Sequence, residues 1–210
     1  MPPAECSAAK GKPMIISCGM GSVEEIHDAV DACRRVGNEQ IVLLKCCSEY
    51  PANYAHMNLA TIEDMQTRFN VPIGISDHSL GALAALVGVS LGACVVEKHF
   101  CLSRKIKNPD SEFSMEPNEF SDMAKQLRAA VEIRGKISYE LTESEKASTV
   151  FRRSVFAIKD IALGEKFTEE NTRVIRPGNG MLPKHYADLL GRKSGSFISE
   201  GTPVFEDMVR

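Results

Sequence analysis

Several features that mark common protein classes are missing from this sequence of 210 residues. Trp is absent, which argues against a binding module built on aromatic platforms. No block of Lys and Arg forms a basic arm and the formal net charge is −3, so we expect no nucleic-acid partner. The longest apolar run, Leu80–Leu91, is too short to span a bilayer and contains Gly and Ser, so we expect no membrane span.

Cysteine is present, but not in a pattern that predicts a structural site. The seven thiols include the adjacent Cys46 and Cys47, and no two form a C-x-x-C pair, which argues against a zinc ribbon. Adjacent cysteines rarely bridge because disulfide geometry does not suit them. Residues 1–12 also lack the apolar core of a signal peptide. We therefore expect reduced thiols and a cytoplasmic protein.

Short apolar runs alternate with helical patterns over the first 140 residues. The runs are rich in Ile and Val, as expected of strands buried on both faces of a parallel sheet. They are residues 14–17, 41–44, 73–75 and 94–96. Helices are predicted after them, near Ser22, Leu59, Leu80 and Pro117, the first with Ser22 and Glu25 as a capping box.

This alternation predicts a (β/α) barrel or a doubly wound sheet. The stretch SCGMGS after the first run lacks the third glycine of GxGxxG, so a dinucleotide-binding domain is the weaker alternative. We assign residues 1–140 to the barrel-like part and the polar residues 141–151 to a linker. Residues 152–210 are predicted to form a small domain of short strands, including 154–158 and 173–175.

Polar side chains follow each predicted strand of the barrel-like part. In parallel α/β folds the active site lies at the carboxyl ends of the strands, so these side chains are expected to meet there. The four ends are Ser17-Cys18-Gly19, Lys45-Cys46-Cys47-Ser48, Ser76-Asp77-His78 and Glu97-Lys98-His99.

His78 and His99 end neighbouring strands and form a candidate metal site. Adjacent parallel strands lie about 5 Å apart, so the two imidazoles can share one ion. Two His with water or a carboxylate suit Mn, Fe, Co or Zn. The alternative is a buried histidine that donates to a main-chain carbonyl, which is the commoner role of one isolated His.

Three further candidates each have a plain structural alternative. Lys45 can hold a phosphate or carboxylate, or simply face solvent. Asp110 lies in the loop IKNPDSEFSMEP, where an Asp after Pro often makes a turn or a cap. Arg176 opens the stretch RPGNG, which alone reads as a turn.

Six segments, in the same order along the chain, resemble the sialic acid synthase family, whose members condense phosphoenolpyruvate with an N-acetylated amino sugar to make nonulosonic acids. The segments are KPMIISCGM (12–20), GNEQIVLLKCCSEYPANYAHMNL (37–59), VPIGISDHSLG (71–81), GACVVEKHF (92–100), RRSVFAIKDIALGEKFTEEN (152–171) and VIRPGNGM (174–181). The resemblance implies a TIM barrel, a small antifreeze-like (SAF) domain, and a divalent metal, usually Mn, on His78 and His99. It also implies a homodimer in which the SAF domain supplies Arg176 to the site of the partner subunit.

The resemblance also implies roles for residues at the strand ends. Ser17, Ser48 and Ser76 match positions near phosphoenolpyruvate, and Asp110 matches a residue that handles the acceptor sugar. The candidate catalytic residues are His78, His99, Asp110 and Arg176. The candidate substrate-binding residues are Ser17, Lys45, Ser48, Ser76, Asp77, Glu97, Asp110 and Arg176.

Within the family, the sequence is most similar to the pseudaminic acid branch, whose acceptor is a 6-deoxy-2,4-diacetamido hexose. Lys45-Cys46 stands where neuraminate enzymes usually have His-Cys, and the loop PDSEFSMEPNEF also matches. N-acetylneuraminate synthesis is the alternative. Cys18 and Cys47 stand where the family usually has Thr, and both changes remove a hydroxyl near the phosphate region.

The barrel-like part contains four β/α units, whereas a closed TIM barrel has eight. KPMIISCGM matches the family near its fifth strand, so we expect the second half of a (β/α)8 barrel. The first half would then be encoded separately or be missing. Two function classes follow. One is an enzyme, either completed by a separately encoded first half or assembled from two copies, and the other is a non-catalytic remnant that keeps a metal-binding or dimerising surface.

Overall fold

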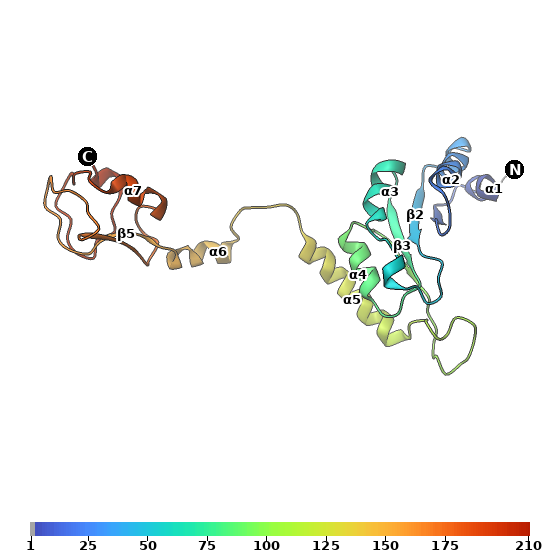
Figure 1. The fold of residues 1–210 in the computed structure, drawn as a ribbon. Coiled ribbons are helices and arrows are strands. Elements are labelled where there is room, and N and C mark those ends of the chain that lie inside the picture. The colour runs from blue at the N-terminus through green and yellow to red at the C-terminus, as the bar shows by residue number, and fades with distance from the viewer. Residues whose placement is uncertain (1–2) are drawn as a thin grey trace. The chain divides into compact units, whose positions relative to one another are not determined.

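The computed structural model describes residues 3–210, which form two compact units (Figure 1). The first extends to Lys136 and the second begins at Ile137. The predicted linker, 141–151, lies within the second unit. No helix in the described part of the chain is long and apolar enough to cross a membrane.

The first unit is built on a parallel sheet of four strands in chain order, as the alternating pattern predicts. The strands are β1 (Met14–Ser17), β2 (Ile41–Cys46), β3 (Ile73–Asp77) and β4 (Val96–Lys98). The helices are α1 (Pro3–Ala8), α2 (Val23–Arg35), α3 (Thr61–Phe69), α4 (Leu83–Ser90) and α5 (Pro117–Arg134), with a 3₁₀ turn η1 (Tyr54–His56). Parallel neighbours deliver all four carboxyl ends to one edge of the sheet.

Three strands differ from the sequence prediction at their carboxyl ends. The strands β2 and β3 continue through polar residues that were expected to follow them, so Ser76 and Asp77 lie inside the strand and only His78 follows it. The strand β4 begins at Val96 rather than Cys94, and Glu97 and Lys98 pair with Ser76 and Asp77. Main-chain hydrogen bonds hold the ladder whatever the side chains are, so an apolar run marks a strand's centre better than its end.

The helices follow their sequence signals with three differences. Ser22 and Glu25 form the expected capping box of α2. The helix α4 starts at Leu83 rather than Leu80, because Gly81 adopts a left-handed conformation (φ +70°) that a helix cannot include. The sequence analysis predicts no helix at the position of α1. In the predicted linker, a second capping box at Thr142 starts the short helix α6 (Glu143–Ser148).

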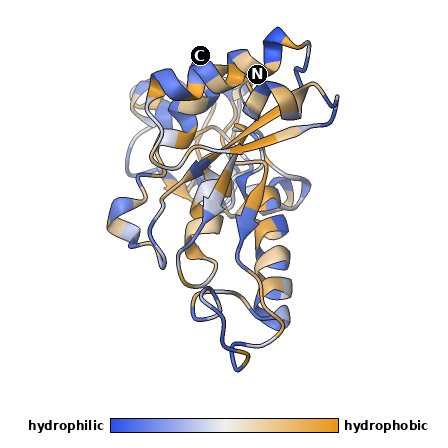
Figure 2. Cartoon of the chain, turned by 90° about the vertical axis from the view of Figure 1, so that its right-hand side faces the viewer, coloured by the Kyte–Doolittle hydropathy of each residue, from blue (hydrophilic) through white to orange (hydrophobic). Residues whose placement is uncertain are grey.

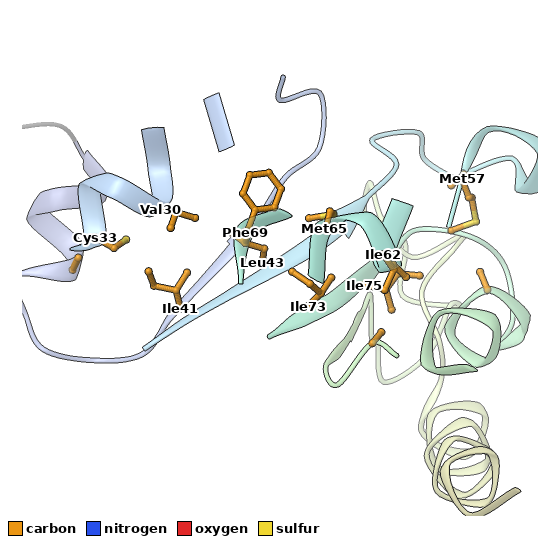
Figure 3. Packing of buried hydrophobic residues seen from close by; sticks show 14 residues of the cluster. Val30, Cys33, Ile41, Leu43, Met57, Ile62, Met65, Phe69, Ile73 and Ile75 are labelled. Atoms are coloured by element: carbon orange, nitrogen blue, oxygen red, sulfur yellow. The ribbon is translucent and has the colours of Figure 1, made fainter. Parts of the chain in front are cut away.

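The core of the first unit lies between the sheet and its helices (Figure 3). Ile73 and Ile75 of β3 pack with Ile62 and Met65 of α3, and all four are at most 3% exposed. Successive side chains of a strand point to opposite faces, so Gly74 and Ser76 face away from these helices. Figure 2 shows apolar residues concentrated in the strands and hydrophilic residues in the loops.

The second unit has its own small core around one antiparallel pair, β5 (Ser154–Ala157) and β6 (Thr172–Ile175). Its other elements are α6, α7 (Tyr186–Leu189) and three 3₁₀ turns, η2 (Thr149–Phe151), η3 (Pro183–His185) and η4 (Glu206–Met208). Isolated bridges, such as Ile161 with Ile198, join the remaining segments. The two predicted strands are confirmed, and most of the rest of the unit is turns and short helices.

Candidate functional site

The carboxyl ends of β3 and β4 border a small hollow of about 250 Å³. Ser76 and Glu97 contribute to it from the strands themselves, and His78 and His99 from the residues that follow. Because the two strands are paired in parallel with Ser76 opposite Glu97, the four side chains converge. The ring centroids of His78 and His99 are 5.2 Å apart.

His78 is buried, with 6% of its surface exposed, and one ring nitrogen is engaged. Its Nδ1 lies 2.9 Å from the main-chain oxygen of Cys47. A carbonyl oxygen can only accept, so Nδ1 carries the proton and donates, which leaves the Nε2 lone pair free. The buried, carbonyl-bonded state is therefore compatible with metal binding, because metal-ligating histidines commonly donate their second ring N–H in this way.

His99 is more open and faces a carboxylate. Its Nδ1 lies 3.7 Å from Asp110 Oδ2, beyond hydrogen-bond length, and its side chain is 30% exposed. The loop that carries Asp110 is ordered by local bonds: Asp110 N–H donates to Asn108 Oδ1, and Asp110 O accepts from Ser114. Asp110 thus makes a turn and also directs its carboxylate toward His99.

The two imidazoles fit a divalent ion as part of its ligand set. Within residues 3–210 no cluster of three or more His, Cys, Asp and Glu side chains is arranged to hold a metal. His78 and His99 would therefore supply two nitrogen ligands, and oxygen ligands from water or substrate would complete the sphere. Such a mixed set of nitrogen and oxygen ligands suits divalent ions of Mn, Fe, Co or Zn.

A hydroxyl and a carboxylate lie together in the hollow. Ser76 Oγ donates to Glu97 Oε1 at 2.7 Å. Ser48 lies at the neighbouring end of β2, where its Oγ is 3.7 Å from Cys46 Sγ. Cys46 Sγ is in turn 3.9 Å from His78 Nδ1, so the ends of β2 and β3 are in contact. These polar groups provide donors and acceptors beside the two histidines.

Two aromatic residues that the sequence did not single out border the histidines. The ring of Tyr50 lies 4.2 Å from that of His78, and the ring of Phe113 lies 4.9 Å from that of His99. Tyr50 is 55% exposed, whereas Phe113 is 7% exposed. Both lie in loops after strand ends, where periodicity gives no signal. The only indication in the sequence is that both lie in stretches that resemble the family, Tyr50 in SEYP and Phe113 in DSEF.

Four candidates lie away from the hollow. Asp77 is 0% exposed and forms an ion pair with Lys98, so protein groups occupy its carboxylate. Lys45 lies on the same face of β2 as Leu43, which packs in the core, and its Nζ donates to Cys46 O. Ser17 is exposed at the end of β1, opposite Leu44. Arg176 is exposed directly after β6 in the second unit.

Cys18 and Cys47, which stand where Thr is usual, pack against the core between sheet and helices. Burial raises the pKa of the Cys18 thiol to about 11, because the thiolate would lose hydration. Its Sγ lies 3.6 Å from Ile16 O. Cys18 is therefore a neutral thiol at physiological pH.

Comparison with known proteins places both units. The model of the NeuB family matches residues 3–139, and that of the SAF domain matches residues 152–210. The chain is 40% identical over 203 residues to a pseudaminic acid synthase from Campylobacter jejuni, covering 97% of this chain and 59% of that protein. It is 33% identical over 202 residues to an N,N'-diacetyllegionaminic acid synthase from Legionella pneumophila, covering 94% and 57%.

Solved structures agree with this similarity. An N-acetylneuraminic acid synthetase from Leptospira borgpetersenii, in complex with citrate, superposes with a TM-score of 0.65 and 33% identity. The match covers 69% of this chain and 50% of that one. The chain thus spans about three-fifths of the length of the curated relatives described above.

Proposed function

Because the chain belongs to the NeuB family and carries a SAF domain, we propose that it forms the metal-binding side of a nonulosonic acid synthase site. The resemblance to the sialic acid synthases is thereby confirmed at the level of the family. The proposed reaction joins phosphoenolpyruvate to an N-acetylated amino sugar and releases phosphate. The observation that carries the proposal is the pair of adjacent imidazoles, His78 and His99, beside the hydrogen-bonded Ser76 and Glu97.

A divalent ion, which we propose to be Mn²⁺, would bind His78 and His99 and act as a Lewis acid toward the aldehyde of the open-chain sugar. Asp110 would accept a hydrogen bond from a sugar hydroxyl beside His99. Tyr50 and Phe113 flank the two imidazoles, so they would limit the access of bulk water from the loop side. Electrostatic interactions are stronger in a site from which water is excluded.

The bond changes follow from the reactants. The C3 carbon of phosphoenolpyruvate attacks the aldehyde carbon, which forms the new C–C bond and leaves an oxocarbenium-like C2. Water adds at C2, and the tetrahedral species loses phosphate. We propose that Ser17, Ser48 and Ser76 donate hydrogen bonds to the phosphoenolpyruvate side, with Lys45 as a nearby positive charge. Glu97 would accept from Ser76 or from the attacking water.

We propose a 6-deoxy-2,4-diacetamido hexose as acceptor, which would make the product a pseudaminic acid. Two observations support this choice: Lys45-Cys46 replaces the usual His-Cys, and the pseudaminic acid synthase relative is 40% identical, against 33% for the legionaminic acid synthase. Synthesis of N-acetylneuraminate is the alternative. All seven cysteines are free, which supports a reducing compartment such as the cytoplasm.

We further propose that these four β/α units are the second half of a (β/α)8 barrel and that catalysis needs further units, on the same or a separate polypeptide. Among the described residues, β1 and β4 each pair on one side only. Beside β4 lies an apolar hollow of about 530 Å³, lined by Val96, Phe120 and Leu127 among others, where further elements would pack. Arg176 would complete the site of a partner subunit in a homodimer.

Metal binding tests the core of the proposal. Replacing His78 or His99 with Ala should lower Mn²⁺ affinity at least about tenfold in calorimetry, because two protein ligands leave little redundancy. His56→Ala is the matched control, since His56 is exposed and pairs with Glu49. Unchanged affinity in both site variants would refute the metal site.

A turnover assay tests the proposed reaction, the acceptor sugar and the need for further barrel units. The assay measures phosphate release from phosphoenolpyruvate with Mn²⁺ and each acceptor sugar, and mass spectrometry identifies the product. The chain alone should be nearly inactive, and adding the N-terminal half of a longer relative should restore turnover. Exclusive formation of N-acetylneuraminate would contradict the acceptor assignment. Metal binding with no turnover in any combination would favour a non-catalytic binding or dimerising module.

A further inference from the structure

A buried ion pair lies directly beside the two histidines. Asp77 and Lys98 are register partners on β3 and β4, and Lys98 Nζ lies 2.8 Å from Asp77 Oδ2. Their side chains are 0% and 1% exposed. Asp77 immediately precedes His78, and Lys98 immediately precedes His99. Successive side chains of a strand point to opposite faces, so Asp77 lies on the same face of β3 as Ile75, which packs against the helices. The side chain of Ser76 lies on the other face.

The pair also holds the turn on which His78 lies. Asp77 Oδ1 accepts a hydrogen bond of 2.8 Å from the main-chain N–H of Ser79, and Lys98 Nζ donates to the main-chain oxygen of Ser79. His78 therefore lies between two residues that are both bound to Lys98. Through Lys98, this closed set of bonds fixes His78 relative to the strand that carries His99.

An ion pair is not the arrangement that stability alone would favour at this position. Removing two charges from water is unfavourable, and a well-packed apolar pair often stabilises a buried site as well or better. Main-chain pairing already sets the register of β3 and β4, but apolar side chains would not bind the turn that follows Asp77. The three directed bonds do so, and metal ligands need to be placed within about 0.5 Å.

We propose that Asp77 and Lys98 are positioning residues that set the spacing of His78 and His99, and thereby the affinity of the site for a divalent ion. The proposal rests on the metal site proposed above. It assigns to Asp77 a role different from substrate binding, and to Lys98, which also lines the hollow, a role in placing the two histidines.

The variants Asp77→Asn, Lys98→Met and the double variant separate positioning from stability. Asn at position 77 keeps an acceptor for the Ser79 N–H, and Met keeps the length of Lys. Each single variant leaves one buried charge without its partner and should destabilise the first unit, whereas the double variant leaves none and should regain stability. Mn²⁺ affinity should nevertheless stay reduced about tenfold or more in the double variant. Lys98→Arg, which keeps the charge, should restore most of the affinity.

Two readouts are needed, each with a control. Calorimetry gives Mn²⁺ affinity, and the nuclear Overhauser effect between the ring protons of His78 and His99 in metal-free protein gives their spacing. Val30→Ala controls for lost stability alone, since Val30 is buried in α2, and Asp64→Asn controls for loss of an exposed ion pair. Both controls should keep wild-type affinity and spacing.

The outcomes distinguish this proposal from the metal site itself. A double variant with wild-type Mn²⁺ affinity and an unchanged ring contact would overturn the positioning role. If the wild-type chain binds no Mn²⁺ but its ring contact disappears in the double variant, the metal site fails and the positioning role stands. If the double variant does not fold, Asp77→Asn decides, because Asn keeps the acceptor for the Ser79 N–H. Folded Asp77→Asn protein with reduced affinity and a lost ring contact supports positioning, and wild-type values for both argue against it.

Discussion

Gly74 lies at the centre of β3, where the substitution Gly74→Ala adds one methyl group in a space that is already filled. An ideal Cβ at this position would lie 2.5 Å from Leu44 Cδ2, 2.6 Å from the main-chain oxygen of Val95 and 2.9 Å from Val95 Cβ. Leu44 is 1% exposed, so its side chain has no solvent to move into. The oxygen of Val95 accepts the N–H of Ile75 at 2.9 Å, so moving it strains the pairing of β3 with the segment leading into β4.

The expected loss follows from these contacts. Adding a methyl group to a close-packed core destabilises by about 1–3 kcal/mol, and a clash with backbone puts this site at the upper end. Ala also restricts the unfolded chain, which returns about 0.4–1 kcal/mol. We therefore expect the free energy of unfolding of the first unit to fall by about 2 kcal/mol.

Thiol labelling measures this loss in the first unit alone. All seven cysteines lie in that unit, and Cys33 is 0% exposed, so its labelling in increasing urea reports unfolding of the first unit. Gly88→Ala is the control. The three nearest atoms to its Cβ would all be side-chain atoms of Ile75, from 3.3 Å, and Ala favours the helix by about 1 kcal/mol. A loss below about 0.5 kcal/mol in Gly74→Ala would refute the packing argument.

Three further substitutions test other parts of the first unit. Ile62→Ala removes a 0% exposed side chain and should cost about 2–5 kcal/mol in urea unfolding, whereas Ile133→Ala, at an 85% exposed position, should change little. Ser22→Ala removes the cap of α2 and should cost about 1 kcal/mol, with Ser121→Ala, at an exposed position inside α5, as control. An equal effect of both would contradict the capping role. Burial raises the pKa of Cys18 from near 9 in the unfolded chain to about 11 in the folded one, so the folded state holds the thiol proton more tightly. The free energy of unfolding should therefore be unaffected by this group below about pH 9 and should fall as the pH rises to about 11. Circular dichroism of wild type and Cys18→Ala over this range measures the difference, and parallel pH profiles would contradict the prediction.

The order of elements in the first unit could be predicted from the sequence, because apolar runs and helical periodicity report directly on burial. The ends of the strands could not. The main-chain ladder of β3 continues to Asp77 through side chains that are polar. The start of α4 could not be predicted either. The apolar stretch Leu80–Leu91 predicts a helix that includes Gly81, but the left-handed backbone of Gly81 moves the start of α4 to Leu83.

The proximity of His78 and His99 could be predicted because neighbouring parallel strands necessarily bring their ends together. That they bind metal stays a prediction. The aromatic residues beside them could not be found, since Tyr50 and Phe113 lie in loops whose paths depend on tertiary contacts. The different surroundings of Asp77 and Ser76 follow from strand alternation, which applies only once the strand is known to include both.

The alternation along β3 divides its residues into two interleaved series with different functions. Ile73, Ile75 and Asp77 belong to the series that faces the helices, and Gly74 and Ser76 belong to the other. Deleting one residue just before Ser76 would exchange the two series, placing a hydroxyl against the apolar core and turning a charged side chain toward the hollow. Deleting two residues would keep each series on its own face while shortening the strand. For this segment, tolerance to a change in length should therefore depend on whether the number of residues is odd or even.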